Sequence, residues 1–339
     1  MPKKKQPETA GSTSYDVAKL AGVSQSAVSR AFRKGASVAP NTRDRIMKAA
    51  KQLGYQPNAF ARGLITKKTH LIAVIISNLT NLNYPEVLAE LTQRLSHEGN
   101  RVLLFSLAAE SDVDEVLEQV WPYRVDGAIV AARLNDEQIH QFNDRGIPII
   151  LYNRVGDTAP AASVCCDSAS GERELVRLLL SSGHKSFGII AGPPDSYVGE
   201  ERLDAARKTL LQAGIEPHFV RGRFDYESGV EGFRALMEQS GSRPDAVVCT
   251  NDAMAIGAID CARNFYELSI PDDISIVGFD GVGPATWASY RLTTIRQPVR
   301  RMTQAAVAML VERIANPGMV PEQRLFGGEF LPGRSARIG

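Results

Sequence analysis

The sequence predicts an α/β protein: an N-terminal all-α headpiece is followed by two lobes, each built on a doubly wound parallel sheet. Three observations predict this architecture. Residues 14–53 carry helical patterns only, the charge balance changes near residue 68, and apolar strands alternate with helical segments from residue 70 onward. Short apolar strands separated by helices are typical of parallel sheets that helices cover on both faces.

The composition is that of a globular protein without a membrane span. Of 339 residues, 44% are apolar and 23% are charged, and no apolar run reaches the roughly 18 to 20 residues that a span needs. The basic start MPKKKQPETAGSTS leads into no apolar signal segment, so we expect the protein in the cytoplasm. Dispersed histidines and the absence of C-x-x-C spacing predict no cofactor and no metal site. Cys165 and Cys166 stand in the apolar run AASVCC and are expected to be buried rather than redox-active.

The net charge of +1 conceals two oppositely charged parts. Residues 1–68 contain 14 Lys and Arg but 3 acidic residues, a net charge of +11. Residues 69–339 contain 25 basic and 35 acidic residues, a net charge of −10. A basic module beside an acidic body is typical of a part that neutralises nucleic-acid phosphates and a part that DNA repels.

The headpiece begins with a helix that has clear start and stop signals. Ser14 can cap this helix, which carries Val17, Ala18 and Ala21 on one face. Gly22 follows at the position where the helix must stop and the chain must turn.

A second and a third helix follow. Ser24 can cap a helix over 25–32 after a three-residue turn, which gives a helix-turn-helix motif. Pro40 can open a third helix that ends before Gly54, although Ala39 offers no capping side chain. The inward positions of the two helices are Ala27, Val28, Ala31, Ile46, Ala49, Ala50 and Leu53.

In a helix-turn-helix, the second helix enters the major groove and its outward residues read bases. An arginine such as Arg30 can bind guanine through two hydrogen bonds. The alternative is that these polar residues only solvate a surface helix. The candidate DNA-contacting residues on this helix are Ser24, Gln25, Ser26, Ser29 and Arg30.

Residues 55–64 suggest a second DNA element. Pro57 and Asn58 mark the start of a helix of roughly eight residues, too short to be stable alone. Such a hinge helix would fold only in the presence of DNA and a second subunit, with Leu64 as an apolar wedge in the minor groove. A plain linker leucine is the alternative.

The headpiece resembles that of the lactose-repressor/galactose-repressor (LacI/GalR) family, and the resemblance continues in order through nearly the whole chain. It implies a homodimer on a pseudo-palindromic operator, a periplasmic-binding-protein-like effector domain, and contacts of Asn58 and Leu64 with DNA. The matching stretches are Tyr15-Asp16-Val17-Ala18, Ala21-Gly22-Val23-Ser24, Val28-Ser29-Arg30, Gly54-Tyr55, Pro57-Asn58, Gly183-His184, 250–257, 270–280 and 292–298.

The larger domain has two series of candidate strands. The first series is 71–77, 101–106, 127–132 and 147–153, and the second is 186–192, 245–251 and 274–280. Helical segments lie between the strands at 86–97, 172–182, 202–213 and 253–266. The two series predict two lobes, since each forms its own sheet.

The resemblance implies three passages of the chain between the lobes. It gives a disordered basic tail over 1–13, a headpiece over 14–56, and a hinge helix with linker over 57–69. The N-lobe is 70–166 plus 298–325, and the C-lobe is 167–297 plus 326–339.

Ligands of open α/β sheets bind beyond the carboxyl ends of the strands, where Arg154, Ser196 and Asp225 are among the polar residues. Polar groups beside an aromatic platform suit a polyhydroxylated ligand such as a sugar, because each hydroxyl both donates and accepts. Matching to the family implies effector contacts at Tyr84, Asn153, Asp167, Arg202, Phe224, Asn251, Asp280 and Gln297. Alternatively, Arg202 pairs with Glu200 or Glu201 on the surface and Phe224 is a core residue.

Two other functional classes remain, a cleft enzyme and an exported sugar receptor. The sequence shows no G-x-S-x-G elbow, P-loop or G-x-G-x-x-G fingerprint. An exported receptor needs a signal segment where this chain has a headpiece. The sequence therefore predicts a transcriptional regulator, expected to be a repressor controlled by a small polar effector, and not an enzyme.

Overall fold

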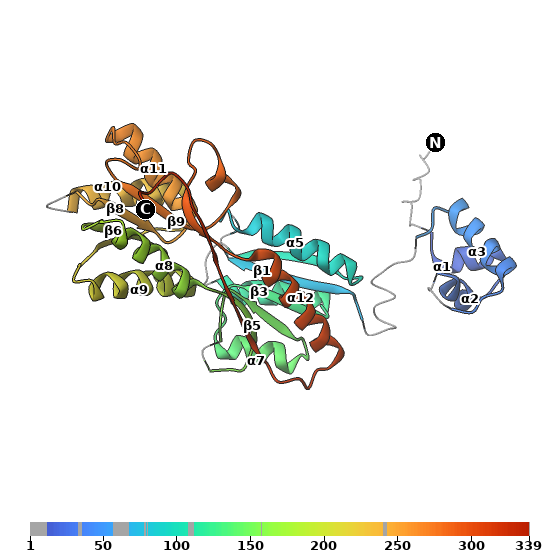
Figure 1. Cartoon of the computed structure of the whole chain (residues 1–339). Coiled ribbons are helices and arrows are strands. Elements are labelled where there is room, and N and C mark those ends of the chain that lie inside the picture. Colours follow the sequence, from blue (N-terminus) through green and yellow to red (C-terminus); the bar gives the residue numbers. More distant parts are fainter. Residues whose placement is uncertain are drawn as a thin grey trace, which may run out of the picture. The chain divides into compact units, whose positions relative to one another are not determined.

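The computed structural model describes residues 12–32, 36–56, 68–77, 79, 81–107, 112–156, 158–239 and 243–338. The chain divides into two units, Met1–Thr69 and His70–Gly339, which are drawn in Figure 1. Most of the predicted tail (1–13) and hinge (57–69) lies outside the described residues, including Asn58 and Leu64.

In the described part of the first unit, three helices pack around a small apolar core. They are α1 (Ser14–Ala21), α2 (Gln25–Ala31) and α3 (Pro40–Gln52). Val17, Val28 and Ile46 each contribute a buried side chain from a different helix. The predicted helix-turn-helix is therefore confirmed.

The cap of α1 differs from the prediction. Thr13, not Ser14, is the N-cap residue: its side chain accepts from the backbone N–H of Asp16, and the Asp16 carboxylate accepts from the Thr13 N–H at 2.8 Å. This capping box needs an acid or amide three residues after the cap, which Thr13 has. Gly22 ends α1 in a left-handed conformation (φ +64°), and Ser24 caps α2, both as predicted.

The N-lobe contains a six-stranded sheet of order β11-β5-β4-β3-β1-β2, and its strand pairs are parallel. One face is covered by α5 and α12 and the other by α6 and α7. The elements are β1 (Leu71–Ser77), α5 (Tyr84–His97), β2 (Arg101–Leu107), α6 (Val113–Val120), η2 (Trp121–Tyr123), β3 (Gly127–Ala131), α7 (Asp136–Asp144), β4 (Ile149–Tyr152), β5 (Ala162–Asp167), α12 (Val299–Ala315) and β11 (Gln323–Gly327).

The C-lobe repeats this arrangement in the order β12-β10-β9-β8-β6-β7. Helices α8 and α9 cover one face, and α10 and α11 cover the other. The elements are α8 (Ser168–Ser181), β6 (Phe187–Ala191), α9 (Tyr197–Gln212), β7 (His218–Arg221), α10 (Tyr226–Gln239), β8 (Ala246–Cys249), α11 (Asp252–Phe265), β9 (Ser275–Asp280), η3 (Gly283–Thr286), β10 (Thr293–Arg296) and β12 (Glu329–Leu331). The edge strand β12 pairs antiparallel with β10, which the sequence reading did not predict.

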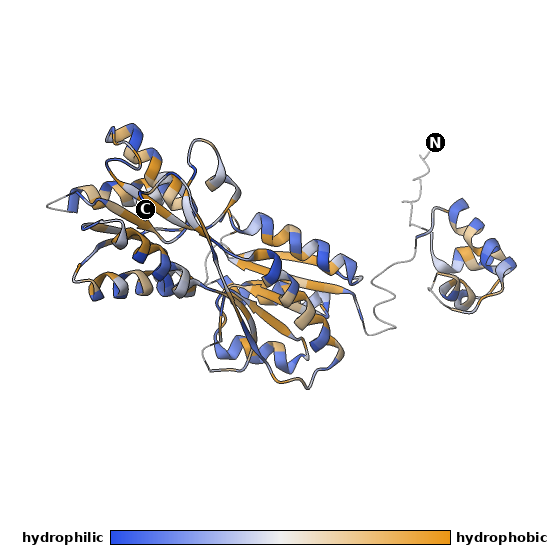
Figure 2. Ribbon diagram, viewed as in Figure 1, coloured by the Kyte–Doolittle hydropathy of each residue, from blue (hydrophilic) through white to orange (hydrophobic). Residues whose placement is uncertain are grey.

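The chain passes between the two sheets after β5, after β10 and after β11. The last passage follows Gly327, two residues beyond the boundary at 325 that the resemblance implied. Apolar strands lie between helices whose hydrophilic sides face outward (Figure 2). Cys165 and Cys166 are free and buried in β5, as predicted. Among the described helices, none is long and apolar enough to cross a membrane.

Candidate functional site

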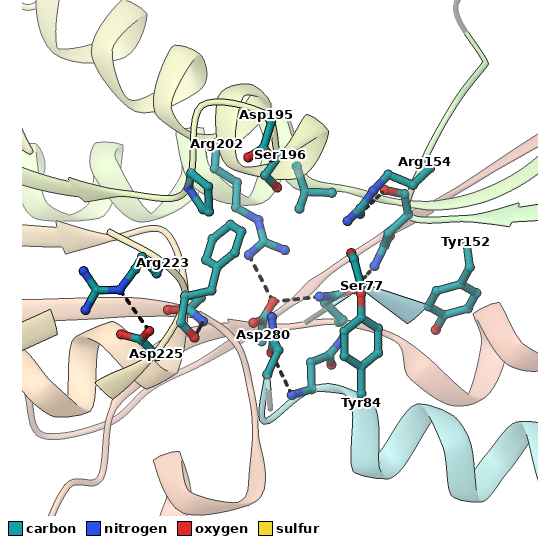
Figure 3. A pocket seen from close by; sticks show the side chains of 18 residues that line it. Ser77, Tyr84, Tyr152, Arg154, Asp195, Ser196, Arg202, Arg223, Asp225 and Asp280 are labelled. Carbon is teal, nitrogen blue, oxygen red and sulfur yellow. Dashed lines mark hydrogen bonds and ion pairs between the residues drawn. The ribbon is translucent and has the colours of Figure 1, made fainter. Parts of the chain in front are cut away.

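A pocket of about 380 Å³ lies where the strand ends of the two lobes meet. Its side chains converge from both sheets and from the passage between them (Figure 3). The lining residues are Ser77, Asn81, Asn83, Tyr84, Tyr152, Asn153, Arg154, Pro193, Asp195, Ser196, Val198, Arg202, Arg223, Phe224, Asp225, Asn251, Asp280 and Gln297.

A chain of hydrogen bonds links the lobes in this pocket. Asn153 Nδ2, at the end of β4, donates to Gln297 Oε1 at 2.7 Å. Gln297 Nε2 donates to Asp280 Oδ1 at 2.7 Å, and the same oxygen lies 3.0 Å from Arg202 Nη1. The N-lobe, the second passage and the C-lobe therefore share one polar network, which Figure 3 shows as dashed lines.

Arg202 is a buried cation held on several sides. Its Nη1 also donates to the Thr250 carbonyl at 2.7 Å, and its guanidinium carbon lies 3.8 Å from the centre of the Phe279 ring. Burial raises the pKa of Asp280, and the charge of Arg202 is the largest opposing influence. The predicted alternative, a surface pair of Arg202 with Glu200 or Glu201, is wrong, because Arg202 is only 2% exposed and pairs with Asp280.

Three pocket residues have a backbone conformation that side chains disfavour. The φ angles are +51° at Asn153, +63° at Phe224 and +120° at Asp280. Such conformations persist where the surroundings enforce them, and they cluster at ligand sites. The side chains of all three residues line the pocket.

Phe224 is contacted by neighbours at its backbone and at its ring. Asn251, which caps α11, donates from Nδ2 to the Phe224 carbonyl at 3.1 Å. A side chain at Gly192 would collide with the ring, so this position requires glycine. Phe224 is 9% exposed and belongs to an apolar cluster, as the core interpretation expected, and it also lines the pocket wall.

Seven of the eight predicted effector residues line the pocket, and they are Tyr84, Asn153, Arg202, Phe224, Asn251, Asp280 and Gln297. The eighth, Asp167, is not among the lining residues, and its carboxylate instead accepts from the Ser170 N–H at the start of α8. Arg154, Ser196 and Asp225, which follow predicted strands, line the pocket as well.

Tyr152 also lines the pocket and was not predicted. Its hydroxyl is buried and has no hydrogen-bond partner among the described residues. Burial raises its pKa well above 10, so it stays a neutral donor and acceptor. The sequence signal for Tyr152 was its position near the end of the predicted strand 147–153, which does not tell whether the side chain faces the core or the cleft.

The first unit presents a polar surface on α2. Ser24, Gln25, Ser26, Ser29 and Arg30 are all exposed, and Ser24 accepts from the Ala27 N–H at 3.2 Å. The opposite side of α2 is buried, so the predicted DNA-contacting side chains share the outward face of one helix.

Arg43 fixes the end of that helix. Its Nη1 and Nη2 donate to the carbonyls of Ala31 and Ala36, each at 3.0 Å. The arginine thus spans from α3 to the segment that follows α2 and uses its donors within the headpiece.

Comparison with known proteins gives matches along the chain. Residues 13–58 match "Bacterial regulatory proteins, lacI family", and residues 176–336 match "Periplasmic binding protein-like domain". The chain is 30% identical to the probable HTH-type transcriptional repressor ExuR of Bacillus subtilis (strain 168), over 96% of this chain and 98% of that protein. It is 33% identical to the HTH-type transcriptional repressor PurR of Proteus mirabilis (strain HI4320), over 94% and 98%.

Solved structures are similar over the same length. The lac repressor dimer bound to operator and the anti-inducer ONPF superposes with a TM-score of 0.85 at 27% identity, covering 96% of this chain and 98% of that chain. The complex of the transcriptional regulator CelR with cellobiose gives a TM-score of 0.72 at 28% identity, covering 96% and 100%.

Proposed function

Because the chain belongs to the lacI family of bacterial regulatory proteins, it is a DNA-binding transcriptional regulator, and we propose that it is a repressor whose dimer binds a pseudo-palindromic operator under the control of a sugar-like effector. The relatives support each part of this proposal. ExuR and PurR are named as repressors, the lac repressor structure is a dimer on operator, and CelR was solved with cellobiose.

The polar network in the pocket carries the effector part of the proposal. Asn153, Gln297 and Asp280 offer amide and carboxylate groups within one hydrogen-bonded chain, while Phe224 and Tyr84 supply aromatic surface. A sugar matches this combination, because its hydroxyls exchange with such donors and acceptors and its C–H faces pack on rings. The predicted contact of Asp167 would require a rearrangement, since its carboxylate caps α8.

The exposed face of α2 supports the DNA part. We assign Ser24, Gln25, Ser26, Ser29 and Arg30 to the major groove, with Arg30 as the best candidate for guanine. Asn58 and Leu64 are assigned to the hinge by the family resemblance alone. The division into headpiece 14–56, hinge 57–69 and two lobes is part of the same proposal.

We further propose that the pocket binds without catalysis and that the protein works in the cytoplasm. The described side chains that line the pocket include no His, Cys or Lys, which are common acids, bases and nucleophiles. Its arginines and aspartates include the pairs Arg202–Asp280 and Arg223–Asp225.

Thermal unfolding of the full-length protein with a panel of sugars, sugar acids and sugar phosphates tests the effector. A ligand at about 100 times its dissociation constant stabilises the folded state by roughly 2.7 kcal/mol. The stabilisation should disappear in Asp280→Asn and persist in Lys208→Ala, an exposed control on α9. Stabilisation that survives Asp280→Asn would place the ligand elsewhere.

Selection of duplexes from a random library, followed by footprinting, tests the DNA part. Two protected half-sites related by a two-fold axis are expected of a dimer with two headpieces. A single unrepeated half-site would contradict the dimer, and failure to enrich any sequence would contradict specific binding.

A further inference from the structure

Glu172 is a fully buried acid outside the pocket lining. Its side chain projects from α8 and is 0% exposed. Neither of its carboxyl oxygens has a hydrogen-bond partner among the residues that the structure describes. A buried polar group without a partner costs about 1–3 kcal/mol, and more when it is charged. The burial of Glu172 therefore lowers the stability of the fold, which suggests that the residue has a function.

The position of Glu172 relates it to Arg202. Ser168 and Glu172 are four residues apart in α8, so they lie on the same side of the helix, one turn apart. Arg202 Nε donates to Ser168 Oγ at 3.4 Å, so α8 presents Glu172 toward the region that the guanidinium occupies. The positive charge of Arg202 lowers the pKa of Glu172, and the negative charge of Asp280 raises it.

The charge of Arg202 thus acts on two buried carboxyl groups, those of Asp280 and Glu172. In the structure Arg202 pairs with Asp280 at 3.0 Å. Burial raises the pKa of Glu172 to about 8, so near neutral pH this carboxyl keeps its proton and leaves the arginine to Asp280. When Glu172 loses its proton to solvent, a second buried carboxylate competes for the same cation.

Building on the proposed function, we propose that Glu172 is a positioning residue for Arg202 and makes operator binding depend on pH. When the Glu172 carboxyl ionises, it draws the Arg202 guanidinium away from Asp280. This movement loosens the hydrogen-bonded network between the lobes. Among the described residues, the Gln297 amide would then remain as the side-chain donor to Asp280. Because the hydrogen-bonded network joins both lobes, a change at Asp280 in the C-lobe affects Gln297 in the passage between the lobes. Through Gln297 it also affects Asn153 at the end of β4.

Other buried groups near this pair respond differently. Burial raises the thiol pKa of Cys166 to about 12 and raises that of Cys249 well above its usual value, so both stay protonated near neutrality. Burial raises the pKa of Asp252 to about 8, and it therefore titrates in the same range as Glu172. Its oxygens, however, accept from Thr294 Oγ1 at 2.6 Å and from the Val282 N–H at 2.9 Å, so its role in holding the segment after β9 is already defined.

The test uses full-length protein and a duplex enriched by the selection described above. Fluorescence anisotropy gives its dissociation constant between pH 6.5 and 9.5 for the wild type, Glu172→Gln, Glu172→Met and Asp252→Asn. Across this range, we expect the dissociation constant of the wild type to change by a factor that exceeds that of both Glu172 variants about fivefold or more. This ratio is typical of an allosteric coupling. Asp252→Asn should retain the change. Equal pH dependence in the wild type and both Glu172 variants would overturn the proposal, as would its loss in Asp252→Asn alone.

A second measurement needs no DNA. In ¹³C spectra of the full chain, the Glu172 carboxyl signal is identified by its absence from Glu172→Gln. In ¹H–¹⁵N spectra, the Arg202 Nε–H signal is identified by its absence from Arg202→Lys. As pH rises, both signals should shift with the same midpoint, which is that of the Glu172 carboxyl. An Arg202 signal that ignores this titration would refute the exchange of partners even if the protein proved not to bind DNA specifically, which separates the two failures.

Discussion

Asn153 and Gln297 are joined across 144 residues of sequence by a hydrogen bond of 2.7 Å whose direction is fixed. Asn153 Oδ1 accepts from the Cys166 N–H at 2.9 Å, so its Nδ2 must be the atom that faces Gln297. Gln297 then accepts through Oε1 and donates through Nε2 to Asp280. The polarity of the whole network thus originates in a backbone N–H of β5.

Gln297→Leu should break this network and destabilise the protein. It removes the acceptor of Asn153 Nδ2 and one of the donors to Asp280, which keeps its pair with Arg202. An unsatisfied buried group costs about 1–3 kcal/mol, so the free energy of unfolding from urea titration should fall by a comparable amount. Gln297→Glu should be worse at pH 7 than at pH 5, since its carboxylate would face Asp280. An unchanged urea midpoint in both variants would contradict the network.

The Arg202–Asp280 pair should show strong coupling in a double-mutant cycle. Both side chains are buried, at 2% and 4% exposure. Removing one partner of such a pair costs about 3–5 kcal/mol, because the other charge stays buried and uncompensated. The loss in the free energy of unfolding in Arg202→Met, and likewise in Asp280→Asn, should therefore exceed half of the loss in the double variant. Strictly additive losses would mean that the two side chains act independently.

Arg30→Ala should relax DNA specificity without unfolding the headpiece. Arg30 is exposed on α2, and the loss of a bidentate guanine contact costs about 1–3 kcal/mol at one base position. Selection with a randomised library should show weakened preference at one position of each half-site. Arg43→Ala is the matched control: it loses two hydrogen bonds inside the headpiece and should lower thermal stability instead. Unaltered base preference in Arg30→Ala would reject its role.

Much of the site could be predicted because parallel strands end at a common edge. Asn153 and Asp280 are the last residues of predicted strands, and the structure places both in the pocket. The partner of Arg202 could not be predicted in this way. Sequence proximity favours Glu200 or Glu201, whereas the observed partner comes from β9 and is brought close only by the order of strands in the sheet.

Residues whose environment depends on packing were harder to predict. The alternation of a strand gives Tyr152 a face but does not show that this face ends at the cleft. The cap of α1 depends on which of two adjacent hydroxyl residues meets Asp16, and the geometry selects Thr13. Glu172 shows no signal in sequence, since an acid in a predicted helix is ordinarily exposed.

Tyr152→Phe should leave the free energy of unfolding unchanged or raise it by about 1 kcal/mol. The lost hydroxyl is buried and has no partner among the described residues, so its removal relieves an unsatisfied group. Tyr290→Phe is the control, because its hydroxyl donates to Asp260 at 3.0 Å and its loss should be unfavourable. If the Tyr152 hydroxyl contacts the effector, the same variant should weaken sugar binding. Clear destabilisation by Tyr152→Phe would show that its hydroxyl has a structural partner.

Glu172→Met should stabilise the protein increasingly as pH rises. The pKa of Glu172 is about 8 in the folded chain and 4.5 ordinarily, so above pH 4.5 the unfolded chain releases a proton that the folded chain keeps. The wild type therefore loses stability relative to the variant as pH rises toward 8, at up to about 1.4 kcal/mol per pH unit. Above the folded pKa the difference stays constant. Asp252, whose pKa is raised in the same direction, leaves a residual slope in the variant. Urea unfolding at pH 5 and pH 8.5 measures the effect, and an equal difference between wild type and variant at both values would show that Glu172 is already ionised in the folded protein at pH 5.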